Sequence, residues 1–179
     1  MSFKHILILC DPSDFGTPGK PNYFGLMPSE KNFIKPRKKP LSSMSPTLFF
    51  KKNEEESSLG DLFMAIGASG GPKIITSVVQ VFINHALLGM PLFESMAHPR
   101  IHDQLLYHEA AVTCFETDVL DGGQIIQVSN RTRTALASRG HKLLSVDYAG
   151  TVQAVAVDLE TKTMSAVSDI RKGGTPAGY

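Results

Sequence analysis

The stretch GASGGPKIITSVVQVFINHALL, residues 67–88, decides how the rest of the chain is interpreted. An apolar run at 62–68 leads into the Gly70-Gly71 pair, and Pro72 then opens an apolar helical pattern. Proline suits the first position of a helix, and Gly89 suits the position just past its end. The sequence therefore predicts a buried strand, a tight glycine turn and a helix in direct succession.

The predicted helix is apolar on every side. Helical rise makes it roughly 25 Å long, and its composition exceeds the single apolar stripe of a surface helix. We therefore expect it to be buried on most of its circumference. Its apolar residues are Ile74, Ile75, Val78, Val79, Val81, Phe82, Ile83, Ala86 and Leu87.

The glycine turn before this helix has two possible roles. Backbone N–H groups at a helix N-terminus point at one spot, with the positive end of the helix dipole behind them. Such a spot can hold an anion, or the oxyanion that forms during acyl transfer. The commoner alternative is that Gly70 and Gly71 only turn the chain. A phosphate loop is disfavoured, because Pro72-Lys73-Ile74 stands where Gly-Lys-Ser/Thr is needed.

Composition places the chain among ordinary globular proteins. Its 179 residues are 42% hydrophobic, which is enough for one domain, 1–179, with its own core. A net charge of +1 argues against nucleic acid as the main partner, and the basic cluster at 35–39 is typical of a solvated loop. Cys10 and Cys114 match neither a disulfide framework nor a metal motif, so we expect two buried thiols.

Other local signals are weak. No run is long enough for a membrane span or a signal peptide, so the chain as given is expected to be soluble. Asn130 opens a glycosylation sequon, which gains weight only in a secreted protein. His98 and His102 are four residues apart, but a proline separates them and no third ligand is evident, so no metal site is expected. Asp169 and Arg171 are expected to form a structural ion pair.

The remaining pattern indicates an α+β protein with segregated strands and helices. A proline-rich loop covers 11–45, which is uncommon in a compact domain unless the loop binds something. The strands at 47–51 and 62–68 are expected to form a hairpin, and the three strands nearest the C-terminus an antiparallel meander. We expect strands at 5–10, 47–51, 62–68, 111–115, 142–147, 152–159 and 164–168, and further helices at 91–97 and 124–139.

Three short pieces carry residue types that suit a free amino-acid head group, which presents an ammonium and a carboxylate side by side. Asp14 supplies an acid for the ammonium, and Ser42 and Ser43 supply neutral donors for the carboxylate. Adjacent serines point to opposite faces of a regular strand, so both reach one carboxylate only where the backbone is irregular. The alternative is that each piece is an ordinary turn.

Several motifs in fixed order resemble the small subunit of γ-glutamyl transpeptidase, also called γ-glutamyltransferase or glutathione hydrolase. The similarity is collinear over nearly the whole chain, which makes it more specific than any one motif. The motifs are PLSSMSPT at 40–47, GASGGPKIIT at 67–76, PRIHDQ at 99–104, Gly140-His141, VQA at 152–154 and SDIRKGGTPAGY at 168–179.

The resemblance implies a partial αββα sandwich of the N-terminal-nucleophile hydrolase type. In that family a proenzyme cleaves itself, and a threonine at the new N-terminus of the small subunit attacks the γ-glutamyl bond, usually of glutathione. The glutamyl group then passes to water, an amino acid or a dipeptide. The implied partner is a large subunit, the implied location is outside the cell, and no cofactor is implied.

The resemblance also implies roles for individual residues. Asp14 would bind the α-ammonium of the glutamyl group, Ser42 and Ser43 its α-carboxylate, and the N–H groups of Gly70 and Gly71 would form the oxyanion hole. Asp11 stands where the family has a longer Glu or Gln, next to a proline that removes a donor.

The largest departure from the family concerns the nucleophile. The family's threonine lies upstream of the segment that resembles residues 9–15, and no residue of this chain matches it. The chain alone is therefore expected to be inactive. The alternative hypothesis is a non-catalytic protein, made of the small-subunit part only, that acts as a binding or interaction module.

Overall fold

The computed structural model of the chain describes residues 14–52, 59–105, 112–119, 123, 125–147 and 149–178. These residues belong to two compact units, one holding 14–42 and the other the described residues from 43 onward. The predicted strand at 5–10, together with Cys10 and Asp11, lies outside the described residues. The expectation of one domain over 1–179 stays a prediction.

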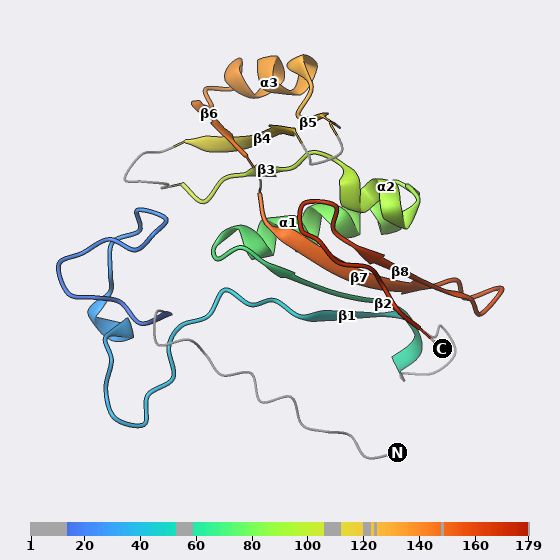
Figure 1. Ribbon diagram of the computed structural model, residues 1–179, viewed down its shortest axis with the longest axis horizontal. Coiled ribbons are helices and arrows are strands. Elements are labelled where there is room, and N and C mark those ends of the chain that lie inside the picture. Colours follow the sequence, from blue (N-terminus) through green and yellow to red (C-terminus); the bar gives the residue numbers. More distant parts are fainter. Residues whose placement is uncertain are drawn as a thin grey trace. The chain divides into compact units, whose positions relative to one another are not determined.

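The second unit is built on an antiparallel sheet with the strand order β1-β2-β7-β8 (Figure 1). The predicted hairpin is confirmed, because β1 pairs with β2. Strand β2 also pairs with β7, so that Met64 lies opposite Ala156 and Ile66 opposite Ala154. The strands are β1 (Thr47–Lys52), β2 (Leu59–Ser69), β7 (Thr151–Val157) and β8 (Met164–Ser168).

Helix α1 (Lys73–Phe82) follows the glycine turn directly, with Pro72 as its N-cap, and a π-helical turn, η3 (Ile83–Leu87), extends it. The expectation that this helix is buried on most of its circumference holds for α1 except along one stripe, where Ile75 is 52% exposed and Val79 47%. It fails for η3, none of whose residues is buried and whose Leu87 is 68% exposed. The physical reason is that the sheet packs against the opposite side of the helix, where Ile74, Val78 and Val81 lie.

The core lies between one face of the sheet and the helices α1 and α2 (Leu92–Ala97). Alternate residues of β2 and β7 face the helices, as the period of a strand requires. Ala154 and Ala156 are small, which leaves room for the bulkier Ile74, Val78 and Val81 of α1. The remaining buried members are Met64, Ile66, Leu92, Met96 and Val152.

A second sheet centres on β4 (Thr113–Val119), and Figure 1 shows α1 and α2 lying between the two sheets. Strand β4 pairs antiparallel with β3 (Ile101–His102) and β5 (Ile125–Gln127), and parallel with β6 (Leu143–Val146). The expected C-terminal meander is therefore only half right: β7 and β8 form a hairpin, but β6 joins the other sheet. Its parallel pairing is possible because a helix connects β5 to β6.

That connecting helix, α3 (Asn130–Ala137), is shorter than the predicted helix at 124–139. Its first residues form β5 instead, because the β-branched pair Ile125 and Ile126 favours a strand. Ser129 then caps α3, accepting a hydrogen bond from the Thr132 N–H at 3.1 Å. In the part of the chain that the structure describes, no helix is both long and apolar enough to cross a membrane.

A buried network of two arginines and two acids joins the elements of this unit. Arg100 Nη2 lies 2.8 Å from Asp169 Oδ2, Arg171 Nη1 lies 3.0 Å from Asp169 Oδ1, and Arg171 Nη2 lies 2.6 Å from Glu116 Oε2. The predicted pairing of Asp169 with Arg171 is confirmed, within this larger group. Burial acts to raise the pKa of Asp169, but the charges of Arg100 and Arg171 outweigh it and hold that pKa below its ordinary value.

Replacing Asp169 with asparagine should destabilise the chain by about 3–5 kcal/mol, because two buried guanidinium groups lose a charge partner. Urea unfolding monitored by circular dichroism measures this. The loss should be fully present at neutral pH, shrink as the pH falls below the ordinary aspartate pKa of about 4, and disappear only below the lowered pKa of folded Asp169, because the carboxylate stabilises the fold only while it is ionised.

Asp61→Asn is the matched control, because Asp61 forms an exposed ion pair with Lys162 at 2.8 Å. Solvent screens such a pair, so the midpoint of unfolding should barely move. Equal losses in the two variants would show that the buried network has no special part in stability.

Candidate functional site

The Gly70-Gly71 turn has a backbone that side chains rarely adopt. The φ angles are 131° at Gly70 and 59° at Gly71, both in the region that favours glycine. Their carbonyl oxygens accept hydrogen bonds from Lys73 N at 3.3 Å and from Ile74 N at 3.1 Å, which close the first turn of α1. Among the described residues, no acceptor takes a hydrogen bond from the N–H of Gly70 or Gly71. Within the described part of the chain, both amides are therefore available to a ligand atom.

Asp14 and Ser42 lie in the first unit, and both are exposed. Asn32, at the end of the short helix η2 (Glu30–Asn32), connects their two segments. Its Nδ2 donates to the Asp14 carbonyl at 2.8 Å, and its Oδ1 accepts from the Leu41 N–H at 2.8 Å. Its own carbonyl accepts from the Gly16 N–H at 3.1 Å. Asn32 therefore holds the acid-bearing segment close to the residue that precedes Ser42.

The sequence analysis did not single out Asn32. An asparagine in a loop rich in proline carries no local signal, because its partners lie 18 and 9 residues away in the chain. In the described part of 11–45, η2 and one isolated bridge between Gly16 and Phe33 are the regular structure, and the role of this loop in a site stays a prediction.

Ser43 belongs to the second unit, and the boundary between the units falls between it and Ser42. The backbone here is irregular, since β1 begins only at Thr47. Ser43 O accepts a hydrogen bond from Ser45 Oγ at 3.1 Å, a local turn that a regular strand does not make. This irregularity meets the condition under which neighbouring serines can both face one carboxylate.

The predicted site residues are thus divided between the two units. Asp14 and Ser42 belong to one unit, and Ser43, Gly70 and Gly71 belong to the other. Their meeting in a single pocket stays a prediction. Asp11, the fourth predicted binding residue, lies outside the described residues.

The two histidines considered as metal ligands are engaged elsewhere. His102 is buried, with Nδ1 2.8 Å from Thr76 Oγ1 and Nε2 3.1 Å from Gln104 Oε1. Burial lowers the pKa of His102, which favours the neutral ring. His98 is exposed, and its Nδ1 lies 3.0 Å from the Pro99 carbonyl. The described residues contain no group of three His, Cys, Asp or Glu side chains that could hold a metal ion.

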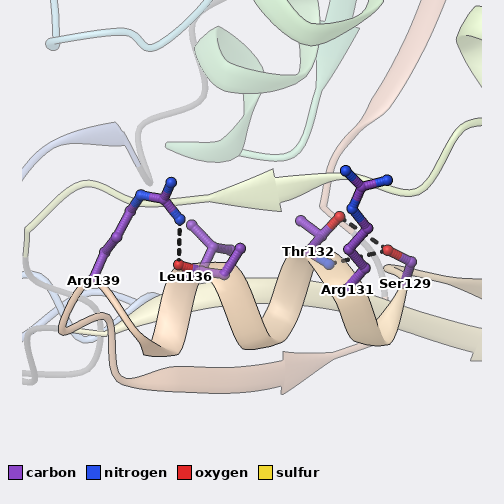
Figure 2. A pocket seen from close by; sticks show the side chains of 6 residues that line it. Ser129, Arg131, Thr132, Leu136 and Arg139 are labelled. Carbon is purple, nitrogen blue, oxygen red and sulfur yellow. Dashed lines mark hydrogen bonds between the residues drawn. The ribbon is translucent and has the colours of Figure 1, made fainter.

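A shallow groove beside α3 is the other concave surface of interest (Figure 2). Arg139, two residues past the end of α3, donates from Nη1 to the Ala135 carbonyl of that helix at 2.7 Å. The predicted site residues of the same unit, Ser43, Gly70 and Gly71, are not among those that line this groove. It is lined by Ser129, Arg131, Thr132, Ala135, Leu136 and Arg139.

Comparison with protein families gives one match over almost the whole chain. The family described as Gamma-glutamyltranspeptidase matches residues 8–179. Glutathione hydrolase 2 of Arabidopsis thaliana is 35% identical over 158 residues, which are 85% of this chain and 25% of that protein. Scoloptoxin SSD20 of Scolopendra dehaani is 30% identical over 175 residues, 97% of this chain and 79% of that protein. The chain spans about a quarter of the length of the Arabidopsis glutathione hydrolases that it matches.

Solved structures give the same result. A γ-glutamyltranspeptidase of Helicobacter pylori superposes with a TM-score of 0.71 at 32% identity, covering 89% of this chain and 78% of that one. The enzyme of Pseudomonas nitroreducens gives 0.73 at 29% identity, covering 93% and 78%. These structures are N-terminal-nucleophile hydrolases, so the expected fold class is confirmed.

Asn32→Ala should open the link between the segment of Asp14 and the segment of Leu41. Loss of a hydrogen bond worth about 1 kcal/mol should speed amide hydrogen exchange at Leu41 about fivefold, as measured by NMR. Asn22→Ala is the matched control, because the Asn22 side chain accepts only from Phe24 and Leu26 in its own turn. Unchanged exchange at Leu41 in Asn32→Ala would contradict the role given to Asn32.

Proposed function

The chain belongs to the γ-glutamyltranspeptidase family, and on this premise we propose that it provides the glutamyl-binding and oxyanion-stabilising part of a γ-glutamyltransferase or glutathione hydrolase. The observation that carries the proposal is the Gly70-Gly71 turn at the N-terminus of α1, whose two N–H groups have no acceptor among the described residues. Two free amides beside the positive end of a helix suit an oxygen that gains negative charge.

The proposed donor site binds the free end of the glutamyl group. Asp14 accepts hydrogen bonds from the α-ammonium, a role proposed for Asp11 too, and Ser42 and Ser43 donate to the α-carboxylate. The arrangement selects a γ-linked glutamyl group, because only a γ linkage leaves both the ammonium and the carboxylate free.

The proposed reaction is acyl transfer. A nucleophilic oxygen attacks the γ-carbonyl carbon, and the carbonyl electrons move onto its oxygen, where the amides of Gly70 and Gly71 stabilise the charge. Collapse of this intermediate breaks the C–N bond and expels the amine, which takes up the proton that the attacking hydroxyl gave up. The resulting glutamyl ester is then cleaved by water or by the amino group of an acceptor.

The proposal assigns the nucleophile to no residue of 1–179. The family places it in an upstream threonine, and neither Thr47 nor Thr76 matches that position. Thr76 is also engaged, since its Oγ1 donates to the Lys73 carbonyl at 3.1 Å and lies 2.8 Å from His102 Nδ1. The 179-residue chain by itself is therefore proposed to bind γ-glutamyl compounds without turning them over.

A large subunit is the proposed partner, and uncovered apolar surface supports it. On the sheet face opposite the core, Leu48, Ala65, Val155 and Ala166 stand in register across all four strands. Leu48 is 60% exposed and Val155 37%. A continuous apolar row of this kind is typical of a surface that another protein layer covers.

An extracellular setting is proposed from the family. It would permit glycosylation of Asn130, which is exposed at the start of α3.

A second candidate function is a binding module without catalysis. The altered segment at 9–15 favours it. Both functions require the glutamyl site, so a binding experiment tests what they share. A turnover experiment separates them. It uses an assembly of this chain with the family's threonine segment and large subunit.

The binding test titrates the chain with glutathione in a calorimeter. Glutathione should bind, whereas cysteinylglycine, which lacks the glutamyl group, should not. Asp14→Asn should weaken glutathione binding at least tenfold, because it removes a charge-assisted hydrogen bond worth about 1.5–3 kcal/mol. Asp61→Asn, which changes an exposed acid of β2, is the control and should leave affinity unchanged. Equal affinity for the two peptides would overturn the proposal.

The apolar sheet face should make the isolated chain self-associate. Sedimentation velocity over a range of concentrations should show oligomers, and the double variant Leu48→Thr with Val155→Thr should reduce them while keeping residues that favour strands. Ile125→Thr is the matched control, because Ile125 is 71% exposed but lies on β5 of the other sheet. A chain that stays monomeric at every concentration would contradict the proposal that another protein layer covers this sheet face.

A further inference from the structure

We infer that Gly150 and Ser77 are positioning residues for the Gly70-Gly71 turn, and that they set the direction of its two free amides. The inference rests on the proposed function, because it concerns the same oxyanion site. Neither residue carries a group that would touch a substrate. Both act on the amides indirectly, by holding the backbone of the turn at 149–150, on which Gly70 packs.

The first observation is a close contact between two glycine turns. A Cβ atom added at Gly70 would lie 2.8 Å from the Cα atom of Gly150, a distance that real Cβ atoms essentially never show. Gly150 is buried and has a φ angle of 84°. The turn that carries the amides therefore rests directly on the backbone of Gly150, with no side chain between them.

Gly150 in turn rests on Ser77. A Cβ atom added at Gly150 would lie 2.5 Å from Ser77 Oγ and 3.3 Å from Ser77 Cβ. Ser77 is fully buried, and its hydroxyl contacts the carbonyl oxygens of both Lys73, at 2.7 Å, and Ala149. It thereby ties the first turn of α1 to the turn at 149–150.

The turn at 149–150 is fixed on its other side by the buried charges. Arg100 Nη1 donates to the Gly150 carbonyl at 2.8 Å, and Glu116 Oε1 accepts from the Ala149 N–H at 3.1 Å. Asp169 Oδ2 accepts from the Val152 N–H at 2.7 Å, two residues further on. A turn with so many of its polar groups bound to buried partners cannot yield easily when a neighbour presses on it.

These contacts form a short path from the buried charges to the amides. A side chain at position 150 would press on Ser77, and the backbone of Gly150 would have to move. Because Gly70 packs on that backbone, the movement would reach the Gly70-Gly71 turn. Oxyanion stabilisation depends on donor direction and distance, and a misplacement of about 1 Å can cost on the order of a hundredfold in rate.

The experiment compares two glycine variants that share the same backbone strain. Gly150→Ala adds a methyl group where Ser77 leaves no room. Gly140→Ala is the control, because Gly140 has a φ angle of 92° but an added Cβ meets nothing within 4 Å. In ¹⁵N-labelled chain, the amide resonances of Gly70 and Gly71 should shift in Gly150→Ala and stay in place in Gly140→Ala. Unshifted Gly70 and Gly71 resonances in a folded Gly150→Ala chain would overturn the inference.

Two further variants keep the test decisive if Gly150→Ala fails to fold. Ser77→Ala removes the hydroxyl tie without adding bulk, and it should also shift the Gly70 and Gly71 resonances. Ser77→Ala combined with Gly150→Ala removes the closest clash, which is with Ser77 Oγ. The double variant should therefore unfold at a higher urea concentration than Gly150→Ala alone. Unmoved resonances in Ser77→Ala, or no gain in stability in the double variant, would count against the coupling.

A kinetic arm separates this inference from the proposed function. In an active assembly that contains this chain, Gly150→Ala should lower kcat ten- to a hundredfold with KM for the γ-glutamyl donor nearly unchanged, because the amides act in the transition state. Gly140→Ala should leave both constants unchanged. No turnover by the wild-type assembly would refute the proposed function and leave the resonance test to decide the inference. A raised KM with unchanged kcat would refute the positioning role.

Discussion

Four buried charges, those of Arg100, Glu116, Asp169 and Arg171, form the constraint on which the second unit depends. They come from the end of α2, from β4 and from the segment after β8, so they join both sheets and a helix. Arg100 and Arg171 also donate to the Met96 carbonyl at 2.7 and 2.9 Å, which fixes the end of α2. Removing charge from water is costly, and the balance of two positive and two negative groups with these hydrogen bonds offsets the cost. Burial works against the charged form of Arg171, but its bonds to Glu116 outweigh this and raise its pKa.

The same network reaches the Gly70-Gly71 turn through its neighbour in space, the turn at 149–150. The carbonyl of Gly150 and the N–H of Ala149 are both bound to network residues. Gly70 packs on Gly150, so the turn that carries the two amides rests on a segment that the network holds. The structure shows no ion pair among the described residues of the first unit. There the neutral side chain of Asn32 joins the segments of Asp14 and Leu41. The two halves of the proposed glutamyl site are therefore held by different physical means.

Residue-level reasoning succeeded where the cause was local. The strand, glycine turn and helix around 67–88 were predicted because apolar periodicity, a proline and a glycine pair act within a few residues. The hairpin of β1 and β2 followed for the same reason. Helix 124–139 was placed too early because the preference of Ile125 and Ile126 for a strand is satisfied by pairing with β4, which their own neighbours in sequence do not show. The exposed stripe of α1 and the exposure of η3 were missed because periodicity reports how apolar a helix is, and the packing partners decide which side is covered.

The sequence by itself determined the α+β class, the order of most elements and the residue types suited to a glutamyl group, since these depend on short-range preferences and on side-chain chemistry. Only the tertiary structure decided that β6 pairs in parallel with β4, that four charges are buried together and that Gly150 lies against Gly70. Each of these joins residues dozens of positions apart in the chain. No local pattern encodes such contacts, because they arise from the way the packed layers meet.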